Sequence, residues 1–378
     1  MTIVIPARAD GWFYQTSMST NLEADDNKRL RSENEKGVVG ANAKVDIKLS
    51  NVTEISEVYV RGALRSVRYD GDDDRAADTD DQLLYAGGRW DGERSQLSVD
   101  GEFLRQSSQF TELTDTGFLE DANRRVDKSL SSQYSYIVRE DTQIFVGGSY
   151  TEVDFPNSIP VSLTEYSVEG LNAGVQHNFD ALNYVTLNIF SSDYEADNSS
   201  DNEVNTIGSN IRYNTSFTEL WQGYAQLGYR KSNFKNQISG SIVRNDDTGV
   251  SYDFGATRND EVSRFNVDFS NSLEPSADGD VNERTEVNFT YNRQFSSRIS
   301  SRVGLKWFED ESINNNQEEE REYWQLSLGA DYRLTPKWYV TSQVRHRDTK
   351  TDNDINSTSA ESDAVIIGIR FQGQENRI

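Results

Sequence analysis

The feature that most constrains this chain is a strict two-residue alternation, clearest in the stretch REYWQLSLGADYRLTPKWYVTSQVRHR at 321–347. Every second position from 324 to 334 is apolar, and the positions between them are polar or small. The alternation resumes after Thr335 and Pro336. Successive side chains of a strand point to opposite faces, so this period predicts two antiparallel strands joined by a short turn.

The same alternation recurs along the whole chain, with short connections alternating with long polar ones as in outer-membrane barrels. Apolar residues occupy alternate positions in 39–49, 58–64, 84–90, 97–103, 221–229, 265–269, 287–291, 303–307 and 365–371. We expect short turns at 51–53, 91–94, 139–141, 179–182, 215–218, 259–261, 295–298 and 334–337. We expect long loops at 24–36, 70–80, 109–126, 155–163, 196–202, 233–248, 273–283, 310–320 and 350–361.

These connections predict eighteen strands, with sixteen as the nearest alternative, and place both termini on the short-turn side. The parity of the pattern slips between Val168 and Leu171, which predicts a β-bulge there. Only five prolines occur, as expected where a closed sheet uses every N–H group.

The composition argues against other folds. Only 35% of the 378 residues are hydrophobic, too few for a large dry core, yet 18 Tyr, 17 Phe and 6 Trp are too many for a disordered chain. No run of about 18 apolar residues could form a transmembrane helix. A solenoid or propeller would show a fixed repeat, and a β-sandwich would be richer in Val and Ile. Aromatic residues near strand ends match the girdles of a membrane barrel: Trp90, Trp221, Trp307, Trp324 and Trp338.

We therefore predict an all-β fold, a single transmembrane antiparallel β-barrel over 10–371, in the outer membrane of a Gram-negative bacterium. Ala7, Arg8 and Ala9 match a signal-peptidase site, so 1–9 are predicted to be the remnant of a signal peptide. An ordinary cytoplasmic N-terminus is the alternative for this segment. Residues 372–378 are predicted to form a short periplasmic tail.

The polar parity carries more basic than acidic residues, although the net charge of the chain is −25. That acidic balance argues against nucleic acid as a partner. A lumen lined by Arg would suit carboxylated or phosphorylated sugars, and inward Tyr rings could stack on sugars. Cross-wall pairs of Arg with Asp or Glu that only hold the barrel's shape are the alternative. The predicted pore-lining residues are Arg61, Arg65, Arg89, Arg212, Arg230, Arg264, Arg302, Arg333, Arg345, Arg370, Tyr224 and Tyr339.

Catalytic and metal-binding patterns are weak. The two histidines, His177 and His346, lie on the apolar parity, and neither has a clear carboxylate or serine partner in the sequence. The acidic loop 70–81 has Asp at alternate positions but no Gly where an EF-hand requires one. It reads as a solvated loop or, alternatively, as a looser Ca²⁺ site shared with lipopolysaccharide phosphates. We predict no enzymatic activity, no cofactor and no metal site.

Two stretches carry a resemblance. AVIIGIRF at 364–371 resembles the C-terminal signal of outer-membrane barrels, which implies that Gly368 and Phe371 are read by the barrel-assembly machinery. The chain departs from that signal by seven further residues. Its length, its acidic loops and GWFYQTSMSTNLEADDN at 11–27 resemble the β-barrel porins of exopolysaccharide secretion loci.

That resemblance implies a passive conduit for export of an exopolysaccharide. Its implied partners are the secreted polysaccharide, a periplasmic polysaccharide export protein, outer-membrane lipids and lipopolysaccharide. Two alternatives stay open: a general or oligosaccharide-specific uptake porin, and an outer-membrane hydrolase. An uptake porin would need a loop folded into the lumen, and only 109–126 and 233–248 are long enough among the predicted loops.

Overall fold

A computed structural model describes residues 10–33, 35–70, 78–108, 111, 123–156, 163–197, 202–238, 241–276, 279–313, 319–353 and 357–377. The predicted signal-peptide remnant 1–9 and most of the acidic loop 70–81 and of loop 109–126 lie outside these residues. The strands are β1 (Gly11–Asp25), β2 (Val38–Val52), β3 (Ser56–Asp70), β4 (Thr79–Asp91), β5 (Ser95–Ser107), β6 (Arg124–Arg139), β7 (Thr142–Asp154), β8 (Glu165–Asn178), β9 (Asn183–Asp197), β10 (Glu203–Ser216), β11 (Trp221–Ile238), β12 (Ser241–Asn259), β13 (Ser263–Pro275), β14 (Val281–Gln294), β15 (Ile299–Ser312), β16 (Glu319–Arg333), β17 (Trp338–Asn353), β18 (Ser357–Gln372) and β19 (Asn376–Arg377).

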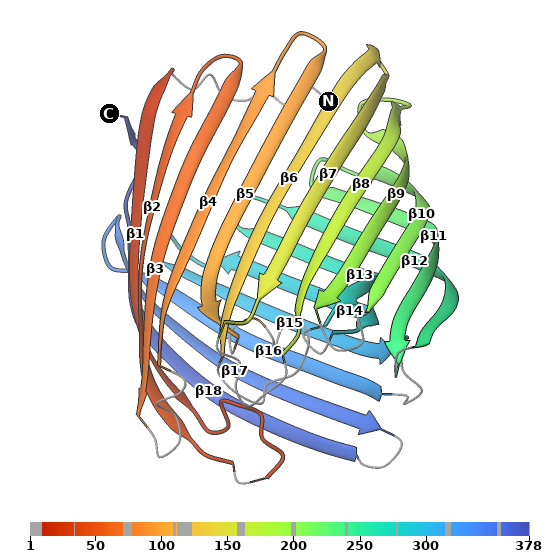
Figure 1. Ribbon diagram of the computed structural model, residues 1–378. Helices are drawn as coiled ribbons and strands as arrows, with labels where there is room; N and C mark the ends of the chain where they lie inside the picture. The colour runs from red at the N-terminus through yellow and green to blue at the C-terminus, as the bar shows by residue number, and fades with distance from the viewer. Residues whose placement is uncertain are drawn as a thin grey trace.

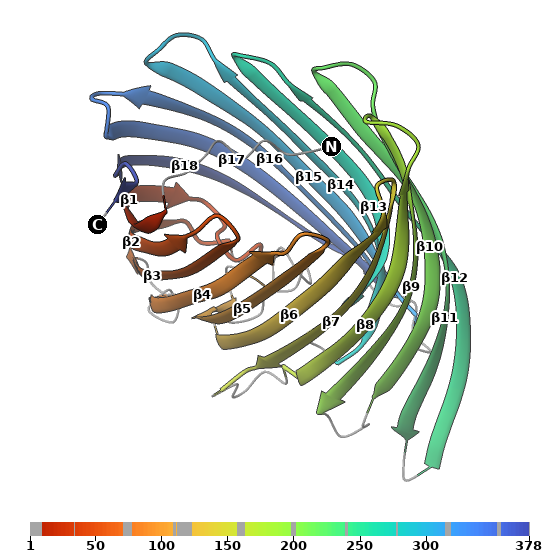
Figure 2. The ribbon, with the colours of Figure 1, turned by 90° about the horizontal axis from the view of Figure 1, so that it is seen from above.

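These strands form one closed sheet (Figure 1). Each strand from β1 to β18 pairs antiparallel with its neighbours in sequence, and β18 pairs with β1 to close the wall. The predicted barrel of eighteen strands is confirmed, and both described chain ends lie at the short-turn end. Viewed from above, the barrel is elongated in cross-section (Figure 2). In the part of the chain that the structure describes, no helix is long and apolar enough to cross a membrane.

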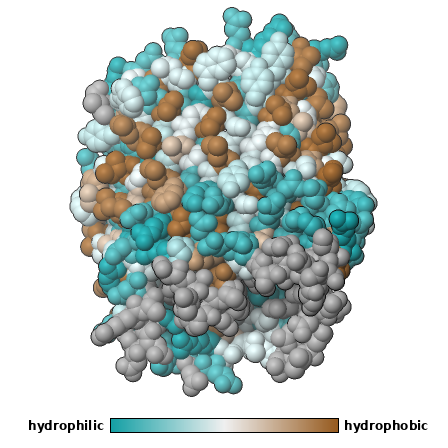
Figure 3. Space-filling model, viewed as in Figure 1, coloured by the Kyte–Doolittle hydropathy of each residue, from teal (hydrophilic) through white to brown (hydrophobic). Residues whose placement is uncertain are grey.

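The apolar parity faces outward, as the alternation predicts. On β2, Val45, Ile47 and Leu49 are exposed at 40%, 52% and 38%, whereas the intervening Asp46 and Lys48 point inward and are less exposed. Apolar side chains spread over the upper part of the outer surface, nearer the short turns, and polar ones lie below them toward the long loops (Figure 3). An outward apolar belt on a closed barrel is the surface that a bilayer requires, so the wall belongs in the outer membrane.

Side-chain caps hold the short turns. Asp260 Oδ1 accepts hydrogen bonds from the backbone N–H groups of Val262 (2.9 Å) and Ser263 (2.6 Å). Asp180 accepts equivalent bonds from Leu182 and Asn183. Short polar side chains at such positions bond backbone donors that no strand partner can reach. The observed turns agree with the predicted ones to within a few residues.

At the other end the strands reach farther than the sequence suggests. The long loop predicted at 233–248 is wrong, because most of this segment belongs to two paired strands. β11 continues to Ile238, and β12 begins at Ser241. Its residues pair across the hairpin, for example Asn233 with Asp246 in the strand register. Only Tyr252–Asn259 of β12 pairs with β13. This segment therefore cannot be the inward loop of a porin.

The predicted bulge near Val168 is also wrong. β8 pairs without a register shift on both sides, and Val168 points inward to pack against a cluster that contains Tyr194 and Val204. The apolar residue breaks the pattern because it fills the interior, not because the backbone slips. A register shift does occur on β6, between Ile137 and Arg139.

The seam between β1 and β18 depends on a close approach. A Cβ on Gly368 would lie 2.0 Å from Asn21 Oδ1 and 2.6 Å from the Thr20 carbonyl oxygen. Beyond Gln372, the N–H of Gly373 bonds the Thr16 carbonyl at 2.8 Å, and β19 then pairs with Phe13 and Tyr14 of β1. The segment predicted as a tail thus extends the pairing of β1 at the short-turn end.

Replacing Leu328, which is 49% exposed on the outer face, with Arg should cost about 2–4 kcal/mol because it brings a charge into hydrocarbon. Gln343→Arg, on the lumen side, is the matched control and should change stability by less than about 0.5 kcal/mol. Equilibrium unfolding in lipid vesicles measures both. Equal losses would mean that the two faces are assigned the wrong way round.

Gly368→Ala should destabilise the barrel by about 1–3 kcal/mol because the new methyl group overlaps Asn21 and Thr20 across the seam. Adding Asn21→Ala should restore only part of the loss, since the Thr20 carbonyl stays in place. Thermal unfolding in detergent tests this. Full stability of the single variant would show that the seam is looser than described.

Candidate functional site: the lumen chamber

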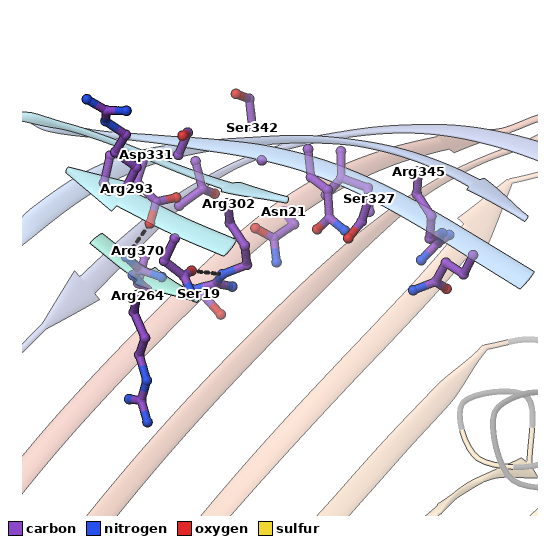
Figure 4. Close-up of a pocket in the computed structure, with 18 of the residues that line it drawn as sticks. Ser19, Asn21, Arg264, Arg293, Arg302, Ser327, Asp331, Ser342, Arg345 and Arg370 are labelled. Carbon is purple, nitrogen blue, oxygen red and sulfur yellow. Dashed lines mark hydrogen bonds and ion pairs between the residues drawn. The ribbon is translucent and has the colours of Figure 1, made fainter. Parts of the chain in front are cut away.

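The main interior space is a chamber of about 940 Å³ lined chiefly by β1 and β13–β18 (Figure 4). Amide and hydroxyl side chains make up much of the lining, including Asn21, Gln325 and Ser327. Three carboxylates reach it, from Glu23, Asp260 and Asp331. Eight basic side chains also line it: Lys28, Arg65, Arg264, Arg293, Arg302, Arg345, Arg347 and Arg370. The chamber therefore carries an excess of positive charge within a protein that is acidic overall.

Three inward arginines toward the short-turn end lack a carboxylate partner. Arg264 and Arg302 lie on either side of Asn292 in the strand register, and Arg302 Nε donates to Asn292 Oδ1 at 2.9 Å. Arg333 lies opposite Tyr339 in the register. Over the described part of the chain, no carboxylate oxygen lies within 4.0 Å of these three guanidinium groups. Their charge is left to water and to passing solutes.

The other predicted arginines are paired. Arg61 meets Asp46 at 2.8 Å, Arg65 meets Asp81 at 2.7 Å, and Arg89 meets Asp91 at 2.9 Å. Four more arginines are paired in the same way: Arg212 with Asp253, Arg230 with Glu283, Arg345 with Glu23, and Arg370 with Asp331. Pairing within the wall, the alternative left open above, thus describes the geometry of these seven.

The predicted tyrosines differ in how open they are. Tyr224 lies over Gly255, where a Cβ would be 2.3 Å from its ring, and Arg212 covers its ring at 3.7 Å. Its hydroxyl donates to Asp253 or Asp268, at 2.8 and 3.0 Å. The ring is therefore packed against the wall and offers little surface for stacking a sugar. Tyr339 has Arg370 above its ring at 5.1 Å.

The inward segment of this barrel is one that the sequence did not reveal. Asn27, Lys28, Arg29 and Leu30, directly after β1, are all at most 9% exposed. Leu30 packs with Phe308, Tyr323 and Ala360 on the inner wall. We call residues 26–31 the inward turn. It fills part of the lumen toward the long-loop end.

The inward turn is fixed by polar contacts as well. The Asn27 amide donates to the carbonyls of Arg31 and Glu361, both at 2.9 Å, and its Oδ1 accepts from the Arg31 N–H at 3.0 Å. Leu30 has φ = 52°, and among the described residues it is the only one other than glycine with positive φ. Such backbone strain persists only where surrounding contacts impose it.

A charge cluster joins the inward turn to the wall. Lys28 Nζ and Arg345 both contact Glu23 Oε1 at 2.6 Å. Arg345 and Arg347 both contact Asp25 Oδ2 at 3.0 Å. Three basic groups therefore surround two carboxylates. Burial lowers the pKa of Lys28 to about 8, with Arg345 and Arg347 adding to this effect and Glu23 opposing it.

The wall across the barrel is different in character. Inward positions on β6–β12 carry mainly hydroxyl and amide groups, such as Ser129, Gln133, Asn172 and Asn210. Toward the long-loop end, Tyr194, Ala196, Val204, Phe234 and Val281 pack into an apolar cluster that closes this corner of the lumen. The open chamber therefore lies on the side of the lumen formed by β1 and β13–β18.

The histidines lie on the outer face, away from the chamber. His346 Nδ1 is 2.8 Å from Asp363 Oδ1, and its ring is 4.7 Å from that of Trp324. The expectation that His346 has no carboxylate partner is therefore wrong, because the cross-strand pairing places Asp363 beside it. His177 contacts Thr142 at 3.0 Å. Among the described residues, no serine hydroxyl bonds either ring and no group of three or more His, Asp or Glu could hold a metal ion.

Comparisons with known proteins bear on the fold. No protein-family model matches the chain, and no curated protein matches it. Among solved structures, OpdK of Pseudomonas aeruginosa with vanillate is 11% identical, with a TM-score of 0.50 over 97% of this chain and 99% of that chain. OccK2 (OpdF) of P. aeruginosa with glucuronate is 10% identical, with a TM-score of 0.49 over 95% of this chain and 98% of that chain. OccAB4 of Acinetobacter baumannii is 8% identical, with a TM-score of 0.46 over 97% of this chain and 100% of that chain.

At these identities the likeness concerns the fold alone, and it agrees with the closed barrel and its apolar belt. Nothing in the comparisons links the chain to exopolysaccharide secretion. The closed wall and its apolar outer belt thus make the chain an eighteen-stranded transmembrane β-barrel of the Gram-negative outer membrane.

Proposed function

We propose that this barrel is a passive uptake porin for small acidic solutes, with acidic sugars as the best fit. The observation that carries the proposal is the chamber, where eight basic side chains outnumber three carboxylates. Rings of like charge in a pore set its ion preference, and guanidinium groups bind carboxylates with directed hydrogen bonds. The unpaired Arg264, Arg302 and Arg333 supply positive charge that no wall carboxylate cancels.

The preference for sugars rests on the uncharged lining. Asn, Gln, Ser and Thr side chains both donate and accept hydrogen bonds, so they can replace the water around hydroxyl groups. Such groups line the chamber at Asn42, Gln343 and Thr341, and they dominate the wall opposite. A volume of about 940 Å³ lies within the range of roughly 300–1,000 Å³ typical of small-ligand sites.

Uptake accounts for the inward turn better than polymer export does. A polysaccharide chain would have to thread continuously past the inward turn, in which residues 27–30 are buried and Asn27 is tied to the wall. A small solute needs only a passage beside them. Export of an exopolysaccharide, the function implied by the sequence resemblance, therefore ranks below uptake. The proposed transport is passive and follows the solute's gradient.

Replacing Arg264, Arg302 and Arg333 together with Gln should lower the chloride-over-potassium permeability ratio about twofold or more, because three uncompensated charges leave the lumen. Reversal potentials in a planar bilayer under a KCl gradient measure the ratio. Swelling of proteoliposomes in gluconate should slow, whereas swelling in arabinose should not. The matched control replaces Arg94, Arg139 and Arg298, which are exposed on the short turns. An unchanged reversal potential in the lumen variant would contradict the proposal.

Anion preference should also fall between pH 7 and pH 9.5. Lys28 has a lowered pKa of about 8, so it loses its proton in this interval and the lumen loses one positive charge. An ordinary lysine, with a pKa near 10.5, would stay charged through most of it. Lys28→Met should begin at the lower ratio and vary little with pH. An equally steep fall in that variant would assign the titration to another group.

A further inference from the structure

A second feature of the chamber is not explained by passive selectivity: the chain holds one of its own carboxylates with three donors. Glu23 Oε1 lies 2.6 Å from Lys28 Nζ and 2.6 Å from an Arg345 nitrogen. The Tyr69 hydroxyl donates to Glu23 Oε2 at 3.0 Å. Charge-assisted bonds of this length are among the strongest available to a carboxylate.

The basic groups around Glu23 are held in place independently of it. Asp25 accepts hydrogen bonds from both Arg345 and Arg347 at 3.0 Å, and it is itself fixed by Ser362 at 2.8 Å. Lys28 is carried by the inward turn, which Leu30 anchors to the wall. Removing the Glu23 carboxylate would therefore take away one of the two carboxylates that Lys28, Arg345 and Arg347 contact among the described residues.

The arginines also retain unused hydrogen-bonding capacity. The Nε atoms of Arg345 and Arg347 are buried, and neither finds an acceptor in the described part of the chain. Arg347 has only 4% of its side chain exposed. Glu23, Lys28, Arg345 and Arg347 all line the chamber. A carboxylate arriving in the chamber thus meets donors that are already oriented.

We infer that Lys28, Arg345 and Tyr69 form a carboxylate-binding subsite at the long-loop end of the chamber, which Glu23 occupies when no solute is present. A solute carboxylate exchanges with that of Glu23, which turns into the water of the chamber while still ionised, so the three donors exchange one carboxylate for another. The ligand class is a monocarboxylate or the carboxylate end of a sugar acid. Only its role as a transported solute rests on the proposed function.

The test removes the Glu23 carboxylate by substitution and then offers acetate as a replacement ligand. Glu23→Ala should lower the unfolding temperature of the detergent-solubilised barrel in sodium chloride. Sodium acetate at the same concentration should raise that temperature by about 2 °C or more, because acetate takes the vacated position. Wild-type protein should show no such difference between the two salts. Glu23→Ala combined with Lys28→Met should lose the response to acetate.

A matched control is Asp331→Ala, which removes another chamber carboxylate, one that a single described side chain holds: Arg370 donates to it at 2.9 Å. An equal response to acetate in that variant would overturn the subsite, as would no response in Glu23→Ala. If Glu23→Ala does not assemble, Glu23→Gln keeps the shape and removes the charge. Acetate conductance of that channel should saturate at an acetate concentration about tenfold lower than in wild type, and identical saturation would overturn the inference.

The two proposals fail separately. Rescue by acetate together with unchanged selectivity of the triple arginine variant would retain the subsite and refute the uptake function. Altered selectivity of the triple arginine variant, without stabilisation of Glu23→Ala by acetate, would retain the uptake function and refute the subsite.

Discussion

Lipid offers no hydrogen-bond partner, so every backbone N–H and C=O group at membrane depth must be paired within the protein. This chain meets that requirement by closing β18 onto β1, and the closure fixes everything else about its interior. Once the wall is closed, alternate residues must enter the lumen whether or not they have a function there. The low hydrophobic content is a direct result, since only one side of each strand needs to be apolar.

An interior made in this way is crowded with charges, and the strand register decides which of them are neutralised. Arg61 finds Asp46 on the adjacent strand, so its charge serves the wall. Arg264 faces Asn292 at the corresponding place, and an amide cannot cancel its charge. The field in the pore therefore depends less on how many arginines point inward than on where Asp and Glu are missing beside them. That distinction separates the shape-holding arginines from those that act on solutes.

The fold was largely predictable from the sequence, because the period of two is imposed locally by lipid on one side and water on the other. Prediction failed where that constraint ends. Beyond the membrane, residues 233–238 and 241–248 form strands without any need for an apolar parity, so their polar sequence resembled a loop. Asp363 beside His346 is a consequence of cross-strand register, which composition does not encode.

The candidate site was less predictable than the fold. The inward parity of the arginines could be counted, but their partners lie on neighbouring strands and depend on register. The inward turn left almost no signal, since a single buried leucine among polar residues looks like an ordinary loop. The left-handed backbone of Leu30 arises from tertiary contacts, which the sequence does not display.

The short ladder between β12 and β13 has a mechanical consequence. It contains eight residue pairs, whereas the seam between β1 and β18 contains nine and gains two more from β19. Of the joints between described strands, the one in the middle of the chain is thus held by fewer rungs than the one where the two ends meet. Under lateral tension the wall should separate between β12 and β13. The twelve strands β1–β12 and the six strands β13–β18 would then remain joined only through the pairing of β1 with β18.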